Sequence, residues 1–337
     1  MKNYKVLILG KGKIGKAVAF YLKKIKNISK IAFFTSERKI KNFDLLIGAL
    51  PGQIGEKGLK LALKYKKNLI DVADLEMDFY QKKKKEIEKA KLLVIPNCGF
   101  CPGLVNLILG KETSTKNKIR EIEIKVGSLS PQKFFFPFLW CFEDLILEHE
   151  IDCWQIISGK KRRFPPFSGY QKEKFFGIKC ESYFGQSDLE YLVSPLKIQN
   201  FKFRLIRPEG FFYFFQFLKN YGFLKKKNLP QIKKILQEKK EDNLTLGEIK
   251  ISSTFQKIVW KIKSFSKKGE KLNSMQKITG LMVAIITNLI FEKKIKKRGI
   301  LPLEEIGKDK KLFDEILKKL KKEKIFVNRI LKKIFLT

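Results

Sequence analysis

The first third of the chain alternates short apolar runs with amphipathic segments. The segments between the runs carry apolar residues at helical spacing, notably in 13–24, 55–65 and 79–90. Strands that alternate with helices at this interval predict a parallel sheet with helical crossovers. Five apolar runs have the length of buried strands: residues 4–9, 30–35, 43–49, 68–72 and 92–96.

One connection in this region is unusually short. Only seven residues, 36–42, separate the second and third apolar runs. A helix and a further strand, which a full mononucleotide-binding half contains there, need at least about twenty residues. We therefore expect a trimmed sheet in which the second strand lies at or near an edge.

From about residue 120 the pattern changes. Ile122, Ile124 and Val126 alternate with polar residues, and further strand-like runs occur at 174–178, 202–206 and 247–251. This pattern predicts a second, α+β domain over residues 112–271, which we expect to bind substrate and to dimerise.

The remainder, 272–337, is predicted to consist of C-terminal helices that return to the first domain. Its apolar stretch at 274–291 has helical spacing, and a lysine-rich tail over 309–337 is expected to be helical.

A glycine fingerprint follows the first apolar run. Gly10, Gly12 and Gly15 form Gly-x-Gly-x-x-Gly directly between a strand and an amphipathic helix. Gly10 permits the turn, Gly12 lets backbone amides approach a pyrophosphate, and Gly15 lets helix and strand pack closely. With Lys13 and Ile14, these residues present the helix N-terminus to phosphates. The sequence thus predicts a dinucleotide-binding Rossmann domain over residues 1–111.

The cofactor is expected to be NADP, with NAD possible. An acid at the end of the second strand binds the ribose of NAD, whereas a basic residue accommodates the 2′-phosphate of NADP. Thr35 and Ser36 occupy the usual acid position, and Arg38 and Lys39 follow closely. Glu37, one or two residues late for the usual role, is the counter-argument.

Composition adds one alternative function. The chain carries 72 basic and 34 acidic residues, a net charge of +38, which invites a nucleic-acid partner. Only eight of the basic residues are arginine, and the lysines are spread along the whole chain, so we expect no specific nucleic-acid partner. Five cysteines without the density of a disulfide scaffold predict a cytoplasmic protein. The apolar run 281–290 is too short to span a membrane, so no membrane partner is expected.

Several motifs resemble the saccharopine dehydrogenase-like family, particularly its lysine 6-dehydrogenase branch. They are Leu50-Pro51, the run from Asp71 to Asp74, the run Asn97-Cys98-Gly99-Phe100-Cys101-Pro102-Gly103-Leu104, and shorter matches at 125–129, 275–280 and 299–305. The resemblance implies hydride transfer between a nicotinamide and the CH–NH or C=N bond of an amino-acid-like substrate. It assigns Leu50, Pro51 and Gly99 to cofactor binding. Phe100, Cys101, Pro102 and Gly103 are assigned to substrate binding.

The resemblance also suggests catalytic groups. Arg207 would anchor a substrate carboxylate through its two-point fork, and Asp74 and Glu181 would handle a proton or bind an ammonium group. We expect the Arg207 guanidinium to be free of a structural carboxylate. A structural ion pair for Arg207, and capping or surface roles for the two carboxylates, remain open.

The sequence departs from the family at one notable position. Phe211 replaces the histidine of the family's Arg-Tyr-Pro-Gly-His segment. His149, the only histidine, is expected to be structural or on the surface. Cys98 and Cys101 have the spacing of a redox dithiol, but two unlinked thiols fit their place in the fold better, and no metal site is expected. A dinucleotide-binding protein without turnover is therefore an alternative to the enzyme.

Overall fold

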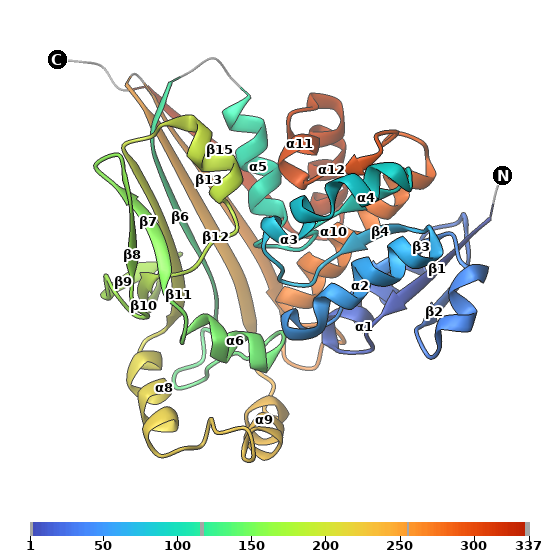
Figure 1. Ribbon diagram of the computed structural model, residues 1–337. Coiled ribbons are helices and arrows are strands. Elements are labelled where there is room, and N and C mark those ends of the chain that lie inside the picture. The colour runs from blue at the N-terminus through green and yellow to red at the C-terminus, as the bar shows by residue number, and fades with distance from the viewer. Residues whose placement is uncertain (1–2, 115–117, 255, 334–337) are drawn as a thin grey trace. The chain divides into compact units, whose positions relative to one another are not determined.

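The computed structural model describes residues 3–114, 118–254 and 256–333, and it divides into two compact units. Unit 1 combines residues 1–116 with 276–323, and unit 2 combines 117–275 with 324–337. Each unit is therefore built from two separate stretches of the chain (Figure 1). The α/β class with a parallel sheet and a second sheet domain is confirmed.

Unit 1 is organised around a parallel sheet of six strands within the described residues. Their order is β2-β1-β3-β4-β5-β14, so β2 lies at an edge, as the short connection after it predicts. Gly299–Ile300 adds the sixth strand beside β5. The strands are β1 (Tyr4–Leu9), β2 (Ile28–Phe33), β3 (Leu45–Gly48), β4 (Asn68–Asp71), β5 (Leu93–Ile95) and β14 (Gly299–Ile300).

Helices cover this sheet. The chain moves from β1 to β2 in one direction and from β3 to β5 in the other, so right-handed crossovers place α1 and α2 on opposite faces. The 3-10 turn η1 (Glu37–Asn42) replaces a crossover helix after β2. The helices are α1 (Lys13–Leu22), α2 (Gly52–Tyr65), α3 (Met77–Lys82), α4 (Lys84–Lys89), α5 (Leu104–Thr113), α10 (Ser274–Phe291), α11 (Leu303–Gly307) and α12 (Lys310–Lys322).

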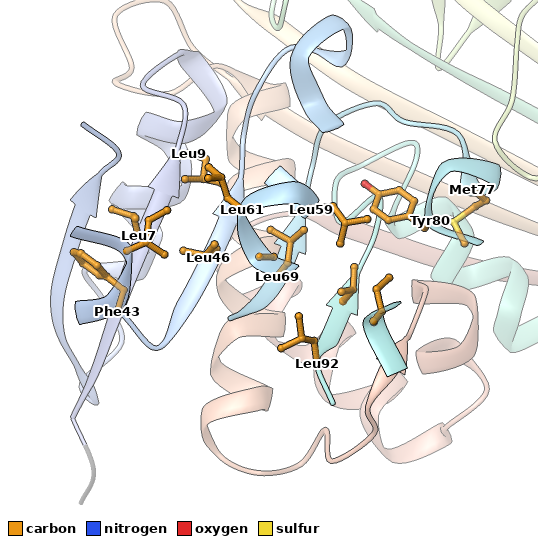
Figure 2. Close-up of a cluster of buried hydrophobic side chains, with 14 residues drawn as sticks. Leu7, Leu9, Phe43, Leu46, Leu59, Leu61, Leu69, Met77, Tyr80 and Leu92 are labelled. Carbon is orange, nitrogen blue, oxygen red and sulfur yellow. The ribbon is translucent and has the colours of Figure 1, made fainter. Parts of the chain in front are cut away.

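Apolar side chains of the strands and of the helices α2 and α3 form a core on one face of the sheet. Leu7 and Leu46 point from the strands toward Leu59 and Leu61 of α2, and Tyr80 of α3 closes the cluster (Figure 2). All five are at most 5% exposed. This burial explains why the strands read as continuous apolar runs, as strands do when both faces of a parallel sheet are covered.

Helix α10 is long and apolar enough to cross a membrane. No segment of that length was expected from the sequence. However, 78% of this 18-residue window is buried inside the structure, as in the core helix of a globular unit. A Cβ added to Gly280 would lie 2.9 Å from the backbone of Ala17, so α10 packs closely on α1. The apolar character of α10 thus follows from packing in unit 1.

Unit 2 contains a mixed sheet of nine strands within the described residues. The main path is β15-β13-β12-β6-β11-β10-β9, and β7 and β8 branch from β11. Only β6 and β11 pair in parallel. The strands are β6 (Ile119–Leu129), β7 (Cys153–Ile157), β8 (Lys160–Phe164), β9 (Gln171–Phe175), β10 (Ile178–Phe184), β11 (Asn200–Pro208), β12 (Asn243–Ser253), β13 (Gln256–Ser266) and β15 (Phe326–Lys333).

Short helices connect these strands. The long apolar loop before α6 and the helices α8 and α9 share a phenylalanine-rich cluster that includes Phe138, Phe142, Phe211 and Phe215. The helical elements are α6 (Phe142–Glu148), α7 (Glu190–Val193), η2 (Ser194–Leu196), α8 (Phe211–Asn220) and α9 (Leu229–Glu238).

Two local predictions are wrong. The tail is helical only as α12, because Phe326–Lys333 form β15, which pairs antiparallel with β13 in unit 2; residues 334–337 of the predicted tail lie outside those described. The run 174–178 is not one strand: it holds the end of β9, a turn at Phe176 and Gly177 with positive φ, and the start of β10. In both places pairing with a distant strand or turn geometry overrides local periodicity.

Candidate functional site

The glycine fingerprint forms a tight junction between β1, β3 and α1. Gly10 has a φ of +117°, and a Cβ added there would lie 2.1 Å from the carbonyl oxygen of Ala49. A Cβ added to Gly15 would lie 2.1 Å from the carbonyl oxygen of Gly10. Both glycines are therefore required by the backbone packing itself.

Gly12 differs from its two neighbours. It is exposed, and a Cβ built there meets no atom within 4 Å. Gly12 is also the N-cap of α1, whose first turn contains no acidic residue. The open space above this helix N-terminus, with Lys13 and Ile14 in its first turn, fits the pyrophosphate of a dinucleotide.

The other predicted cofactor residues follow neighbouring strands. Leu50 and Pro51 come directly after β3, whose end is tied to β1 by the hydrogen bond from Ala49 N to Leu9 O at 2.8 Å. Thr35, Ser36 and Arg38 follow β2 and are exposed. Carboxyl ends of parallel strands form the ligand edge of such sheets, so these residues lie on the edge that carries the fingerprint.

Glu37 has partners on α2. Its Oε2 accepts from Lys64 Nζ at 2.6 Å and from the Tyr65 hydroxyl at 3.0 Å. The bond from Lys64 holds the pKa of the Glu37 carboxyl below its ordinary value. The acid that would bind the ribose of NAD is thus engaged elsewhere within unit 1.

A buried carboxylate lies at the end of β4. Asp71 has no exposed surface; its Oδ1 accepts from Ala73 N and its Oδ2 from the Tyr80 hydroxyl, each at 3.0 Å. Burial raises the pKa of Asp71 to about 7, although both hydrogen bonds oppose that shift. The same burial, with the nearby Asp71, raises the pKa of the Tyr80 phenol. Asp74, the predicted proton-handling residue, lies three positions further on and is exposed.

The predicted substrate loop closes on itself beside this carboxylate. Gly99 N donates to Pro102 O at 3.1 Å, and Gly103 N donates to Asn106 Oδ1 at 2.9 Å. The Cys101–Pro102 peptide is cis, and Gly103 has a φ of +138°. A Cβ on Gly103 would lie 2.1 Å from Gly99 O, so only glycine fits there.

The side chains of this loop differ in exposure. Phe100 is 3% exposed, while Cys101 and Pro102 are half-buried. Cys98 is fully buried, and burial raises the pKa of its thiol strongly, so this thiol is a poor nucleophile. Neither Cys98 nor Cys101 forms a disulfide in the structure.

In unit 2, the predicted Glu181 caps a helix. Its carboxylate accepts from Gly210 N at 2.9 Å, from Phe212 N, and from the Tyr170 hydroxyl at 3.3 Å. Gly210 and Phe212 belong to the N-terminus of α8, whose free amides favour a negative charge. Burial raises the pKa of the Glu181 carboxyl, and these donors oppose that shift. The capping role that the sequence left open is the one its contacts show.

Arg207 also has a structural partner, so the expectation that its guanidinium is free of a structural carboxylate is wrong. Arg207 is 4% exposed, its Nη2 forms an ion pair with Glu148, and its Nη1 donates to Ile206 O at 3.0 Å. Its Nε is buried without a hydrogen-bond partner among the described residues. The adjoining hollow, which Ser128 and Trp140 also line, has a volume of about 10 Å³. That is room for roughly one water molecule.

The only histidine is structural. His149 is 2% exposed; its Nδ1 lies 2.6 Å from Leu145 O and its Nε2 lies 2.7 Å from the Tyr183 hydroxyl. Burial, together with the positive charge of Arg207, lowers its pKa well below the ordinary value. Its ring centroid lies 5.1 Å from that of Phe211, the residue at the position of the missing family histidine.

The family model for the saccharopine dehydrogenase C-terminal domain matches residues 99–325. The chain belongs to this family. A solved apo saccharopine dehydrogenase (L-Glu forming) from Saccharomyces cerevisiae has a TM-score of 0.79 at 16% identity, covering 98% of this chain and 100% of that one. DAP dehydrogenase of C. glutamicum, solved with DAP, gives a TM-score of 0.47 at 11% identity, covering 90% and 94%. The likeness to the yeast enzyme shows the fold alone, and no curated protein matches significantly.

Sequence reasoning missed the partners that hold the predicted residues. Asp71 was named only as the first residue of a motif and given no role, and Tyr80 and Glu148, which bind Asp71 and Arg207, were not singled out. An aspartate that closes a buried strand was a usable signal for Asp71, because such a charge needs local donors. No comparable signal marks Glu148, which meets Arg207 across 59 residues of sequence.

The second and third glycines of the fingerprint, Gly12 and Gly15, should respond differently to valine. Gly12→Val should keep the unfolding temperature and lose dinucleotide binding, because its side chain enters the open space above α1. Gly15→Val should lower the unfolding temperature by several degrees, since its Cβ meets the Gly10 carbonyl. Thermal unfolding and nucleotide fluorescence titration measure both. Unchanged dinucleotide affinity in Gly12→Val would remove the assignment of this loop.

Asp71 should make stability depend on pH. The pKa of Asp71 in the folded protein is about 7, above its ordinary value of 3.8. Its contribution to the free energy of unfolding is therefore fully present below about pH 4 and is lost as pH rises through about 7. Asp71→Asn removes this dependence. The unfolding free energy of the unmodified protein, relative to the variant, should fall by up to about 1.4 kcal/mol per pH unit across that window. Urea unfolding at several pH values tests this, and parallel curves for the two proteins would contradict it.

Proposed function

We propose that this protein is an NAD(P)-dependent oxidoreductase that acts on the CH–NH or C=N bond of an amino-acid-like substrate of the lysine or saccharopine type. Membership of the saccharopine dehydrogenase family supports a nicotinamide-dependent amino-acid dehydrogenase. The observation that carries the proposal is the open fingerprint at Gly12, on the same strand-end edge as the loops of Asp74 and Gly99–Gly103.

The residues of unit 1 would hold the dinucleotide. The amides at the start of α1 bind the pyrophosphate, and Leu50 and Pro51 line the space beyond it. Gly99, whose Cβ would lie 3.0 Å from Pro102 O, lets the substrate loop stay compact beside the nicotinamide. The bound nicotinamide supplies or accepts the hydride, and the protein provides position and proton transfer.

Asp74 is the carboxylate we assign to proton handling or ammonium binding. It is exposed near a strand end, whereas the carboxylate of Glu181 caps a helix. An exposed carboxylate can exchange a proton with substrate and solvent, while a helix cap loses its bonds when it is protonated. We therefore assign Glu181 to holding the α8 N-terminus.

Arg207 stays the proposed anchor of the substrate carboxylate, provided that one of its guanidinium donors can reach the substrate. Its fork is engaged by Glu148, and the hollow beside it holds roughly one water molecule. Binding would require the substrate carboxylate to replace Glu148 or to use the remaining Nε donor. The homodimer and the cytoplasmic location stay predictions.

The activity can be tested with purified protein and a panel of lysine, saccharopine and polyamine-like substrates. We expect absorbance at the nicotinamide band to change only when dinucleotide and a matching substrate are both present. Asp74→Asn should lower kcat by about 10²-fold and leave dinucleotide affinity unchanged, as expected for loss of a proton-handling group. Dinucleotide binding without turnover on any substrate would instead favour the non-catalytic binding protein.

The NADP preference can be tested at Arg38. Its exposed guanidinium follows β2, and the neighbouring Glu37 is engaged by Lys64 and Tyr65. Arg38→Ala should weaken NADPH binding by about 1–3 kcal/mol and leave NADH nearly unchanged, because the charge-assisted contact involves only the 2′-phosphate. Lys41→Ala, an exposed lysine further along η1, is a charge-matched control. Equal losses for both dinucleotides would show that Arg38 does not contact the phosphate.

A further inference from the structure

The slot around Asp71 is built from three elements of unit 1. A Cβ added to Gly48, the last residue of β3, would lie 2.3 Å from Asp71 Oδ1, and one added to Gly58 of α2 would lie 3.4 Å from Oδ2. The Tyr80 hydroxyl of α3 faces the same carboxylate at 3.0 Å. A side chain at Gly48 would thus occupy the place of the Asp71 carboxylate, and Gly58 borders the same space.

Asp71 holds both ends of the segment that carries Asp74. Its Oδ1 binds the amide of Ala73 at the start of the segment, and its Oδ2 binds Tyr80 in the helix that follows. Leu75 O, inside the segment, accepts from Asn97 Nδ2 at 3.2 Å. Asp74 therefore lies between fixed points.

The substrate loop is attached to the same residue. Cys98 N donates to the main-chain oxygen of Asp71 at 2.7 Å, directly before the Gly99–Gly103 loop begins. Asn97, which binds Leu75, immediately precedes Cys98. Both loops that the proposed function uses are thus connected through the end of β4.

We propose that Asp71 is a positioning residue that fixes the segment of Asp74 and the loop Gly99–Gly103 in one geometry at the sheet edge. This inference rests on the proposed function for its kinetic consequence, while its structural part stands on the contacts of Asp71 alone. Asp71 touches no reacting group, because it is fully buried beneath the edge. A shift of about 1 Å in such a group can cost up to about a hundredfold in rate.

The titratable groups around Asp71 include no base that could form an ion pair with its carboxylate. Tyr80 and Cys98 face it from α3 and from the loop after β5, and Asp74 adds negative charge nearby. None of these groups is cationic, so geometry and hydrogen bonding hold the carboxylate in place. Shape should therefore matter more than charge at this position.

Three variants and one control separate shape from charge. Asp71→Asn keeps the shape and removes the charge, Asp71→Glu keeps the charge and does not fit beside Gly48, and Tyr80→Phe removes one hydrogen bond. Asp44→Asn is the control, because Asp44 Oδ2 also accepts a backbone amide, from Lys5 at 2.7 Å, but precedes β3.

The readouts are kcat and KM per dinucleotide-binding site, and hydrogen exchange of peptides covering 72–76 and 97–103. We expect Asp71→Glu to lower kcat by about a hundredfold, and Asp71→Asn and Tyr80→Phe by about tenfold or less, with dinucleotide affinity within about twofold. Exchange should accelerate in both peptides, and Asp44→Asn should match the unmodified protein.

Two results would overturn the inference. The first is unchanged exchange in both peptides of a folded Asp71 variant. The second is a loss of rate that follows only the loss of dinucleotide-binding sites, as simple destabilisation would give. If the unmodified protein turns over no substrate, the proposed function fails, while the exchange data still decide whether Asp71 holds the two loops. Tyr80→Phe keeps the slot filled, so it provides the test if the Asp71 variants do not fold.

Discussion

The close approach of α1 to the end of β1 is the constraint on which unit 1 depends. Gly15 faces the Gly10 carbonyl, and Gly10 faces that of Ala49, each at a separation that excludes any side chain. This contact sets the direction of α1 and brings the ends of β1 and β3 together. Gly12, between them in sequence, packs against no other segment, so its surface is open to a ligand.

The same sheet tolerates a reduced topology. The 3-10 turn η1 leads directly from β2 to β3, and β2 forms an edge. The ligand edge is unaffected, because β1, β3, β4 and β5 keep their order. A buried carboxylate, Asp71, then ties two of the strand-end loops together. A trimmed Rossmann sheet can therefore retain the parts that position a dinucleotide.

Unit 2 shows why a catalytic role cannot be assigned from residue type alone when the residue is buried. Glu181 and Arg207 are opposite each other in the β10–β11 pair, yet each has its own partner, the α8 N-terminus and Glu148. His149 is likewise satisfied by Leu145 and Tyr183. Buried polar groups need such partners, so a polar residue in a motif is as often a structural contact as a reactive one.

The sequence by itself determined the first five strands of unit 1, the edge position of β2, and the fingerprint, because continuous apolar runs and glycine spacing are local signals. It did not determine β14, the two-residue strand that completes this sheet. It did not determine that Phe326–Lys333 form a strand, since that depends on pairing with β13, some 60 residues away. Nor did it reveal Glu148 beside Arg207, or the slot that Gly48 and Gly58 leave for Asp71. Only the tertiary structure decided these features, because hydrogen bonds and close contacts between distant segments produce no periodic pattern in the sequence.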